Sequence, residues 1–134
     1  MKKILFVEDQ PEWKLSALFD WLKFSNVSFQ YEIVESVTAA RRYLARKNTK
    51  VDLVVTDLGL PRFDGERVTN PMMGLELVDN MWHINAEVPV IINSTSYIPN
   101  FNEFKEDYDF RKQQLYKVDS LMEMKDWFVE FLTN

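Results

Sequence analysis

The chain has 134 residues, of which 46% are hydrophobic and 28% charged, and this composition predicts one globular domain with a core of its own. It has no cysteine and one histidine, which excludes disulfides, cysteine zinc sites, thiol nucleophiles and multi-histidine metal sites. The formal net charge of −5, from 16 basic and 21 acidic residues, argues against direct nucleic-acid binding, which relies on neutralising phosphates.

Short apolar runs alternate along the chain with segments of helical spacing. The expected strands cover residues 4–7, 29–33, 51–55, 88–92 and 115–116. The expected helices cover residues 11–22, 37–44, 75–82, 98–108 and 121–131. Pro11 opens the first helix, and Ser120 with Glu123 forms a capping box before the last one. The run 4–7 stops at Glu8, which is too short for a signal peptide, and no run is long enough to span a bilayer.

Five successive strand–helix units predict an α/β fold, a three-layer doubly wound (βα)5 domain with a parallel five-stranded sheet. Strands buried on both faces are continuously apolar, as the first, third and fourth are. The second strand alternates and the fifth is short, so both are expected at the edges. With right-handed crossovers the strand order is 2-1-3-4-5, the flavodoxin-like order, and the switch point lies between strands one and three.

Charged and polar residues follow the central and last strands. Glu8 and Asp9 follow the first strand, Asp57 ends the third, Ser94 follows the fourth and Lys117 ends the fifth. Parallel strands bring these ends to one edge of the sheet. Two carboxylates about 5 Å apart repel by roughly 3 kcal/mol at an effective dielectric near 20, so three together need a cation. Carboxylate oxygens without His or Cys favour Mg²⁺ or Mn²⁺ over zinc.

Four segments of the chain resemble the receiver domain of two-component response regulators, the CheY-like family. The segments are residues 4–11 with the acidic pair, 51–61 with Asp57 and Pro61, 89–94 with Ser94, and 115–117 with Lys117. Each is moderately specific alone, but they occur in the family's order and with matching separations. The resemblance covers nearly the whole chain and implies a single receiver domain over residues 1–134.

The resemblance implies a role for each residue at this edge. Asp57 would be the nucleophile that takes a phosphoryl group from a phosphohistidine. Ser94 would hydrogen-bond a phosphoryl oxygen, and Lys117 would offset its charge. The implied ligands of Mg²⁺, or of Mn²⁺ in its place, are the side chains of Glu8, Asp9 and Asp57 and the backbone carbonyl of Gly59. In-line phosphoryl transfer needs such positioning and electrostatic stabilisation more than bond-making side chains.

The resemblance also implies a biological role. The protein would be a stand-alone cytoplasmic response regulator that catalyses only its own phosphorylation and dephosphorylation. Its partners would be a sensor histidine kinase or phosphotransfer protein and an unknown output protein, with no direct contact to nucleic acid or membrane. A homodimer would form through the fourth predicted helix (98–108), the fifth strand and the last helix.

Departures from the family pattern leave two alternatives open. Val118 stands where the family usually has proline, and Gln114 where it usually has the aromatic switch residue. A degenerate receiver that acts unphosphorylated, as a protein-interaction module, is therefore the first alternative. The second is a Mg²⁺-dependent phosphatase with an aspartyl nucleophile. Gly59 argues against the phosphatase, because such enzymes often carry an acidic residue there as general acid.

The segment after Asp57 contains two candidates for the family's single glycine before the third helix. These are Gly65 and Gly74, nine positions apart. The spacing predicts an inserted loop at about residues 63–73, which is either a surface loop or a flap that offers Glu66 or Arg67 to a partner.

Overall fold

The computed structural model describes residues 1–46, 50–81, 88–94, 98–99, 102, 115–118 and 125–133. One parallel sheet runs through them in the order β2-β1-β3-β4-β5, which confirms the predicted topology. The strands are β1 (Lys3–Val7), β2 (Gln30–Val34), β3 (Leu53–Asp57), β4 (Val90–Asn93) and β5 (Leu115–Val118).

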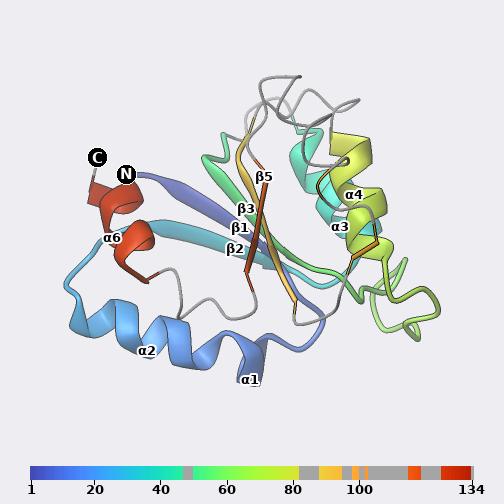
Figure 1. Ribbon diagram of the computed structural model, residues 1–134, viewed down its shortest axis with the longest axis horizontal. Helices are drawn as coiled ribbons and strands as arrows, with labels where there is room; N and C mark the ends of the chain where they lie inside the picture. The colour runs from blue at the N-terminus through green and yellow to red at the C-terminus, as the bar shows by residue number, and fades with distance from the viewer. Residues whose placement is uncertain are drawn as a thin grey trace.

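Helices cover both faces of this sheet, so the domain has the three predicted layers (Figure 1). One layer contains α1 (Pro11–Lys14), α2 (Ser16–Phe24) and α6 (Lys125–Thr133). The opposite layer contains α3 (Val37–Leu44) and α4 (Met73–Met81). The predicted helix over 98–108 and the Ser120–Glu123 capping box lie outside the described residues, except for positions 98, 99 and 102.

The central strands explain the two cores, because successive side chains of a strand point to opposite faces. Ile4 and Phe6 of β1 pack with α2 and α6, whereas Leu5 and Val7 pack with α3 and α4. All four side chains are fully buried. A strand buried on both faces must be apolar at every position, which is why the sequence of β1 reads as a continuous hydrophobic run.

Three details differ from the sequence-based expectation. The helix predicted over residues 11–22 is divided into two helices, because Leu15, with φ −102° and ψ −12°, separates α1 from α2. The edge strand β2 buries less than expected, and Tyr31 is 50% exposed because no further strand covers it. In α4 the side chains of Leu77, Val78 and Met81 are fully buried, whereas Leu75, which the sequence placed on the buried face, is only partly buried.

The chain ends lie close together, on the side of the sheet away from the carboxyl ends of the strands (Figure 1). The Lys2 ammonium donates to the Phe131 carbonyl and lies over the Phe131 ring, which ties the two termini. The peptide bond between Lys117 and Val118 is trans. Among the described helices, none has both the length and the apolar character that crossing a bilayer requires.

Candidate functional site

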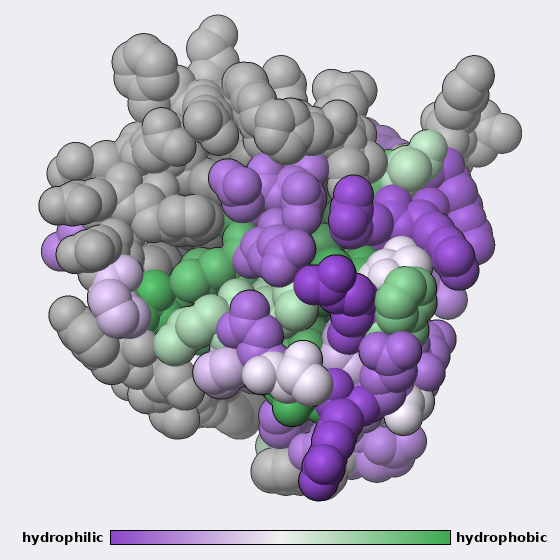
Figure 2. Space-filling view, turned by 90° about the vertical axis from the view of Figure 1, so that its right-hand side faces the viewer, coloured by the Kyte–Doolittle hydropathy of each residue, from purple (hydrophilic) through white to green (hydrophobic). Residues whose placement is uncertain are grey.

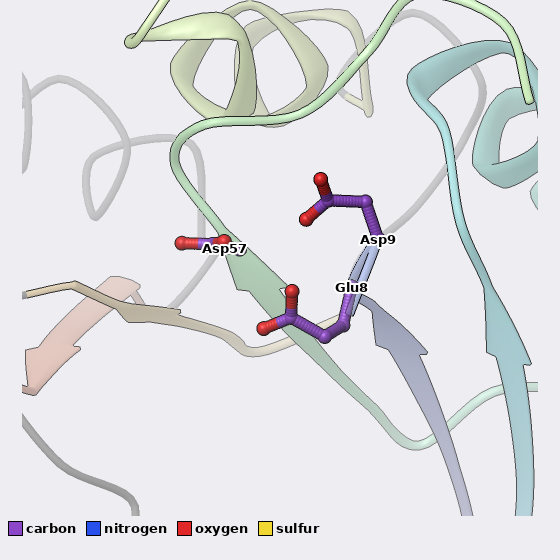
Figure 3. A group of neighbouring side chains, drawn as sticks. All are labelled: Glu8, Asp9 and Asp57. Atoms are coloured by element: carbon purple, nitrogen blue, oxygen red, sulfur yellow. The ribbon is translucent and has the colours of Figure 1, made fainter. Parts of the chain in front are cut away.

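The register of the central strands brings three carboxylates together. Val7 pairs with Thr56, so Glu8 and Asp57 are the next residues on neighbouring strands. Asp9 follows immediately in the chain. One carboxylate oxygen from each of Glu8, Asp9 and Asp57 lies within 4.8 Å of the others, and Figure 3 shows the three side chains meeting at the ends of β1 and β3. We call these three residues the acidic cluster.

Asp57 is held by contacts to both of its carboxylate oxygens. Oδ1 accepts a hydrogen bond of 2.7 Å from the backbone N–H of Leu58, which orients the side chain. Oδ2 accepts one of 2.9 Å from the ammonium of Lys14. The side chain is 12% exposed, so it remains reachable from solvent. The predicted nucleophile is therefore positioned at the surface with one oxygen bound to a cation of the chain itself.

Glu8 is the most buried member of the acidic cluster, with a side chain 4% exposed. Burial raises its pKa to about 7, and the negative charge of Asp57 and a hydrogen bond with Asp9 act in the same direction. The hydrogen bond from the Gln10 N–H, 3.2 Å, and the charge of Lys14 lower the pKa but do not outweigh these effects. The cluster thus concentrates more negative charge than its surroundings stabilise.

Asp9 carries the observation that points most directly to cation binding. Its Oδ1 is buried and has no hydrogen-bond partner among the described residues. A buried carboxylate oxygen without a partner costs free energy that a bound cation would recover. Three oxygen donors without nitrogen or sulfur suit Mg²⁺ or Mn²⁺. The acidic cluster therefore fits the divalent ion expected from the sequence.

Lys14 is the residue of this site that sequence reasoning missed. Its Nζ lies 2.9 Å from Asp57 Oδ2 and 3.5 Å from Glu8 Oε2. Burial lowers its pKa, but the hydrogen bond to Asp57 and the charges of Asp57, Glu8 and Asp9 outweigh that and raise it above 10.5. A usable signal was present, because no other basic residue occurs between Lys3 and Lys23. Lys14 also stands one turn after Pro11, directly downstream of the acidic pair.

Ser94 and Lys117 lie together at the neighbouring strand ends. Ile92 pairs with Lys117 in the sheet, and the Lys117 ammonium donates a hydrogen bond of 3.0 Å to the Ser94 carbonyl. The Ser94 N–H donates to the Val118 carbonyl, 2.9 Å. Asp57 pairs with Asn93, so Ser94 follows the residue beside the predicted nucleophile. We call Ser94 and Lys117 the lysine–serine pair.

The glycines after Asp57 differ in what they permit. A Cβ on Gly74 would lie 2.2 Å from the Asp57 carbonyl oxygen, and the Gly74 N–H donates to the Leu58 carbonyl, 2.8 Å. Gly65 instead has a φ of +78° in the exposed segment 62–71. Gly59 is half-buried, with Val68 above it at 3.8 Å from a built Cβ. The absence of a side chain at Gly74 therefore lets α4 pack against the end of β3, where Asp57 lies. The role of the Gly59 carbonyl as a metal ligand stays a prediction.

The face that surrounds the strand ends is mainly polar. Figure 2 looks onto the side of the molecule where the 62–71 segment lies, and hydrophilic side chains dominate its described part. A band of hydrophobic surface runs between them.

Response regulators and receiver domains are prominent among the solved structures with a similar fold. The Mn²⁺-bound form of response regulator Rcp1 has a TM-score of 0.65 at 21% identity, over 97% of this chain and 96% of that one. The phosphorylated cyanobacterial phytochrome response regulator RcpA has a TM-score of 0.64 at 24% identity, over 99% and 94%. A CheY-like receiver domain protein from Methanospirillum hungatei JF-1 has a TM-score of 0.63 at 17% identity, over 98% and 96%. No family model and no curated protein matches the sequence. The shared fold is that of CheY-like receiver domains.

Proposed function

We propose that this protein is a response regulator receiver that accepts a phosphoryl group on Asp57 from a phosphohistidine, with Mg²⁺ or Mn²⁺ bound at the acidic cluster. The observation that carries the proposal is the meeting of three carboxylates within 4.8 Å at the end of β3, one of them the predicted nucleophile. A purely structural site has no reason to gather these charges, because each raises the cost of ionising the others.

The chemistry would be an in-line transfer. A carboxylate oxygen of Asp57 attacks the phosphorus, the new O–P bond forms, and the N–P bond of the donor breaks with its electron pair going to the imidazole. A divalent ion held by Glu8, Asp9, Asp57 and the Gly59 carbonyl would supply positive charge to the phosphoryl oxygens. The chain itself then positions the nucleophile through the Leu58 N–H.

The lysine–serine pair would receive the transferred group. The Ser94 hydroxyl would donate to a phosphoryl oxygen, and the Lys117 ammonium would move from the Ser94 carbonyl, 3.0 Å away, toward the new negative charge. Both residues stand at the same edge of the sheet as Asp57. A change in their contacts would alter the loop after β4, which is how phosphorylation would reach an output partner.

The donor would be a sensor histidine kinase or a phosphotransfer protein, and the protein would act in the cytoplasm through protein contacts. The similar structures include a phosphorylated response regulator and the receiver domain of a hybrid histidine kinase, which supports this class of partner. The protein would catalyse only its own phosphorylation and dephosphorylation. A homodimer through the face of residues 98–108, β5 and α6 remains part of the proposal, although most of 98–108 lies outside the described residues.

One observation favours the second candidate, a receiver that acts without phosphorylation. Asp57 Oδ2 is paired with Lys14, and an oxygen bound to an ammonium is a weaker nucleophile. If that ion pair persisted, the site would be a neutralised protein-interaction surface. A phosphatase is less well supported, because Gly59 offers no side chain as general acid.

Intact-mass spectrometry after incubation with Mg²⁺ and acetyl phosphate separates these candidates. We expect one added phosphoryl group on the wild-type protein and on Asp79→Asn, which removes an exposed carboxylate of α4. Asp57→Asn should remain unlabelled. An unlabelled wild-type protein, or equal labelling of Asp57→Asn, would reject phosphorylation at Asp57 and favour the interaction module. Multiple turnover on phosphoesters would favour the phosphatase.

A further inference from the structure

Lys14 places a positive charge against the same carboxylates that would hold the divalent ion. Its Nζ is 2.9 Å from Asp57 Oδ2 and 3.5 Å from Glu8 Oε2. Oxygens of these two carboxylates and of Asp9 lie within 4.8 Å of one another. An ammonium that is hydrogen-bonded to one of three prospective ligands and ion-paired with a second occupies the electrostatic position that a cation would take. We propose that Lys14 is a tethered counter-ion that competes with the divalent ion and is displaced when the ion binds.

The ion pair explains how the acidic cluster is tolerated in the metal-free protein. Glu8 is almost completely buried and Asp57 is 12% exposed, so water screens their repulsion poorly. One ammonium offsets part of this charge and one divalent ion offsets more. Both together are unfavourable, because the ammonium would then face a second cation at close range. The two cations therefore exclude each other.

The position of Lys14 allows this displacement. The lysine is the last residue of the four-residue helix α1, and the helical run is interrupted immediately after it at Leu15. Its side chain is 29% exposed, in contrast to the 4% of Glu8. A lysine side chain has four methylene groups, so its ammonium can reach water without moving the backbone. The Lys14 ammonium can thus move away from the carboxylates into water.

Displacement also connects the ion to the nucleophile. The Lys14 ammonium bonds Asp57 Oδ2, while Oδ1 accepts from the Leu58 N–H. When the lysine withdraws, Oδ2 loses a hydrogen bond from a cation of the chain and becomes available to the ion and to a phosphoryl donor. Lys14 therefore acts as a positioning residue that keeps Asp57 neutralised until a divalent ion arrives. This inference rests on the proposed function, since it needs the ion at the acidic cluster.

The test is the affinity for Mn²⁺, which is measured from the electron paramagnetic resonance signal of the free ion. We expect Lys14→Met and Lys14→Gln to bind Mn²⁺ about tenfold more tightly than wild type, which corresponds to losing one partly buried ionic competitor. Lys14→Arg, which keeps the charge, should bind within about threefold of wild type. Lys23→Met makes the same change in net charge at the exposed end of α2 and should also stay near wild type.

Thermal unfolding is a second measurement, and it detects variants that are poorly folded. In EDTA, thermal unfolding of Lys14→Met and Lys14→Gln should begin at a lower temperature than that of wild type, and saturating Mg²⁺ should raise their midpoint by more. Unchanged or weaker Mn²⁺ affinity in both neutral variants would overturn the competition while leaving the metal site intact. Absence of Mn²⁺ binding in wild type and all variants would instead overturn the metal requirement of the proposed function and this inference with it.

Discussion

The acidic cluster and the lysine–serine pair share one edge of the sheet but are built differently. In the cluster, like charges face one another on the central strands β1 and β3, and the cation among them comes from a helix. In the pair, on β4 and β5, an ammonium is bonded to a neutral backbone carbonyl. The first half stores electrostatic repulsion that a cation relieves. The second half holds a positive charge through one hydrogen bond to a carbonyl, which under the proposed function it would exchange for a phosphoryl group.

The largest effect on the acidic cluster should come from disturbing the backbone contact between α4 and the end of β3. Gly74→Ala would place a methyl group 2.2 Å from the Asp57 carbonyl oxygen and 2.9 Å from the Leu58 Cα. Because both contacts are backbone, α4 must shift, and we expect a loss of about 3 kcal/mol in the free energy of unfolding. Urea denaturation measures it, with EDTA present to exclude metal effects.

Gly59→Ala is the matched control for that substitution. Its new methyl group would meet only the Val68 side chain, at an ordinary 3.8 Å. We expect the stability to change by less than about 1 kcal/mol. If both alanine variants unfold at the same urea concentration, the close approach of α4 to Asp57 does not support the acidic half of the site.

Replacing the lysine of the second half should separate chemistry from ion binding. Lys117→Met should slow phosphoryl labelling by acetyl phosphate about a hundredfold, the usual cost of removing one charged donor from a transition state. Mn²⁺ affinity should change little, because Lys117 bonds the Ser94 carbonyl in the resting protein. Lys125→Met, at an exposed position of α6, controls for net charge. Unchanged labelling in Lys117→Met would show that the pair does not receive the phosphoryl group.

The pH dependence of stability should report on the acidic half. Because the folded pKa of Glu8 is raised from 4.5 to about 7, the folded state binds this proton more tightly than the unfolded state does. The stabilisation is complete below pH 4.5 and is lost as pH rises through 7. We expect the metal-free protein to lose about 3 kcal/mol over this window.

Two measurements check the assignment to Glu8. Glu8→Gln should flatten the fall in stability between pH 4.5 and 7, because its amide does not titrate. Saturating Mg²⁺ should reverse the fall in wild type, since the ion binds the ionised carboxylates. A slope in EDTA that survives in Glu8→Gln would assign the titration to another group.

The sequence predicted the fold and the strand-end residues for a definite physical reason. Continuous apolar runs such as 4–7 and 53–55 specify strands buried on both faces, and a parallel sheet then aligns their ends. Glu8 and Asp57 follow from that register alone. The role of Lys14 did not follow, because its ion pairs with Asp57 and Glu8 are tertiary contacts. The choice between Gly65 and Gly74 likewise needed the approach of α4 to Asp57, which is a tertiary contact.

The smallest effect should come from the hydroxyl of the lysine–serine pair. Both backbone groups of Ser94 are engaged, its N–H with the Val118 carbonyl and its carbonyl with the Lys117 ammonium. Ser94→Ala therefore leaves the backbone and the lysine in place and removes one neutral donor to the phosphoryl group. Neutral hydrogen bonds are about half as strong as charged ones, so we expect labelling to slow about tenfold, less than in Lys117→Met. Ser28→Ala, at an exposed position before β2, should label like wild type. A larger loss in Ser94→Ala than in Lys117→Met would mean that the hydroxyl, and not the ammonium, is the main recipient of the transferred charge.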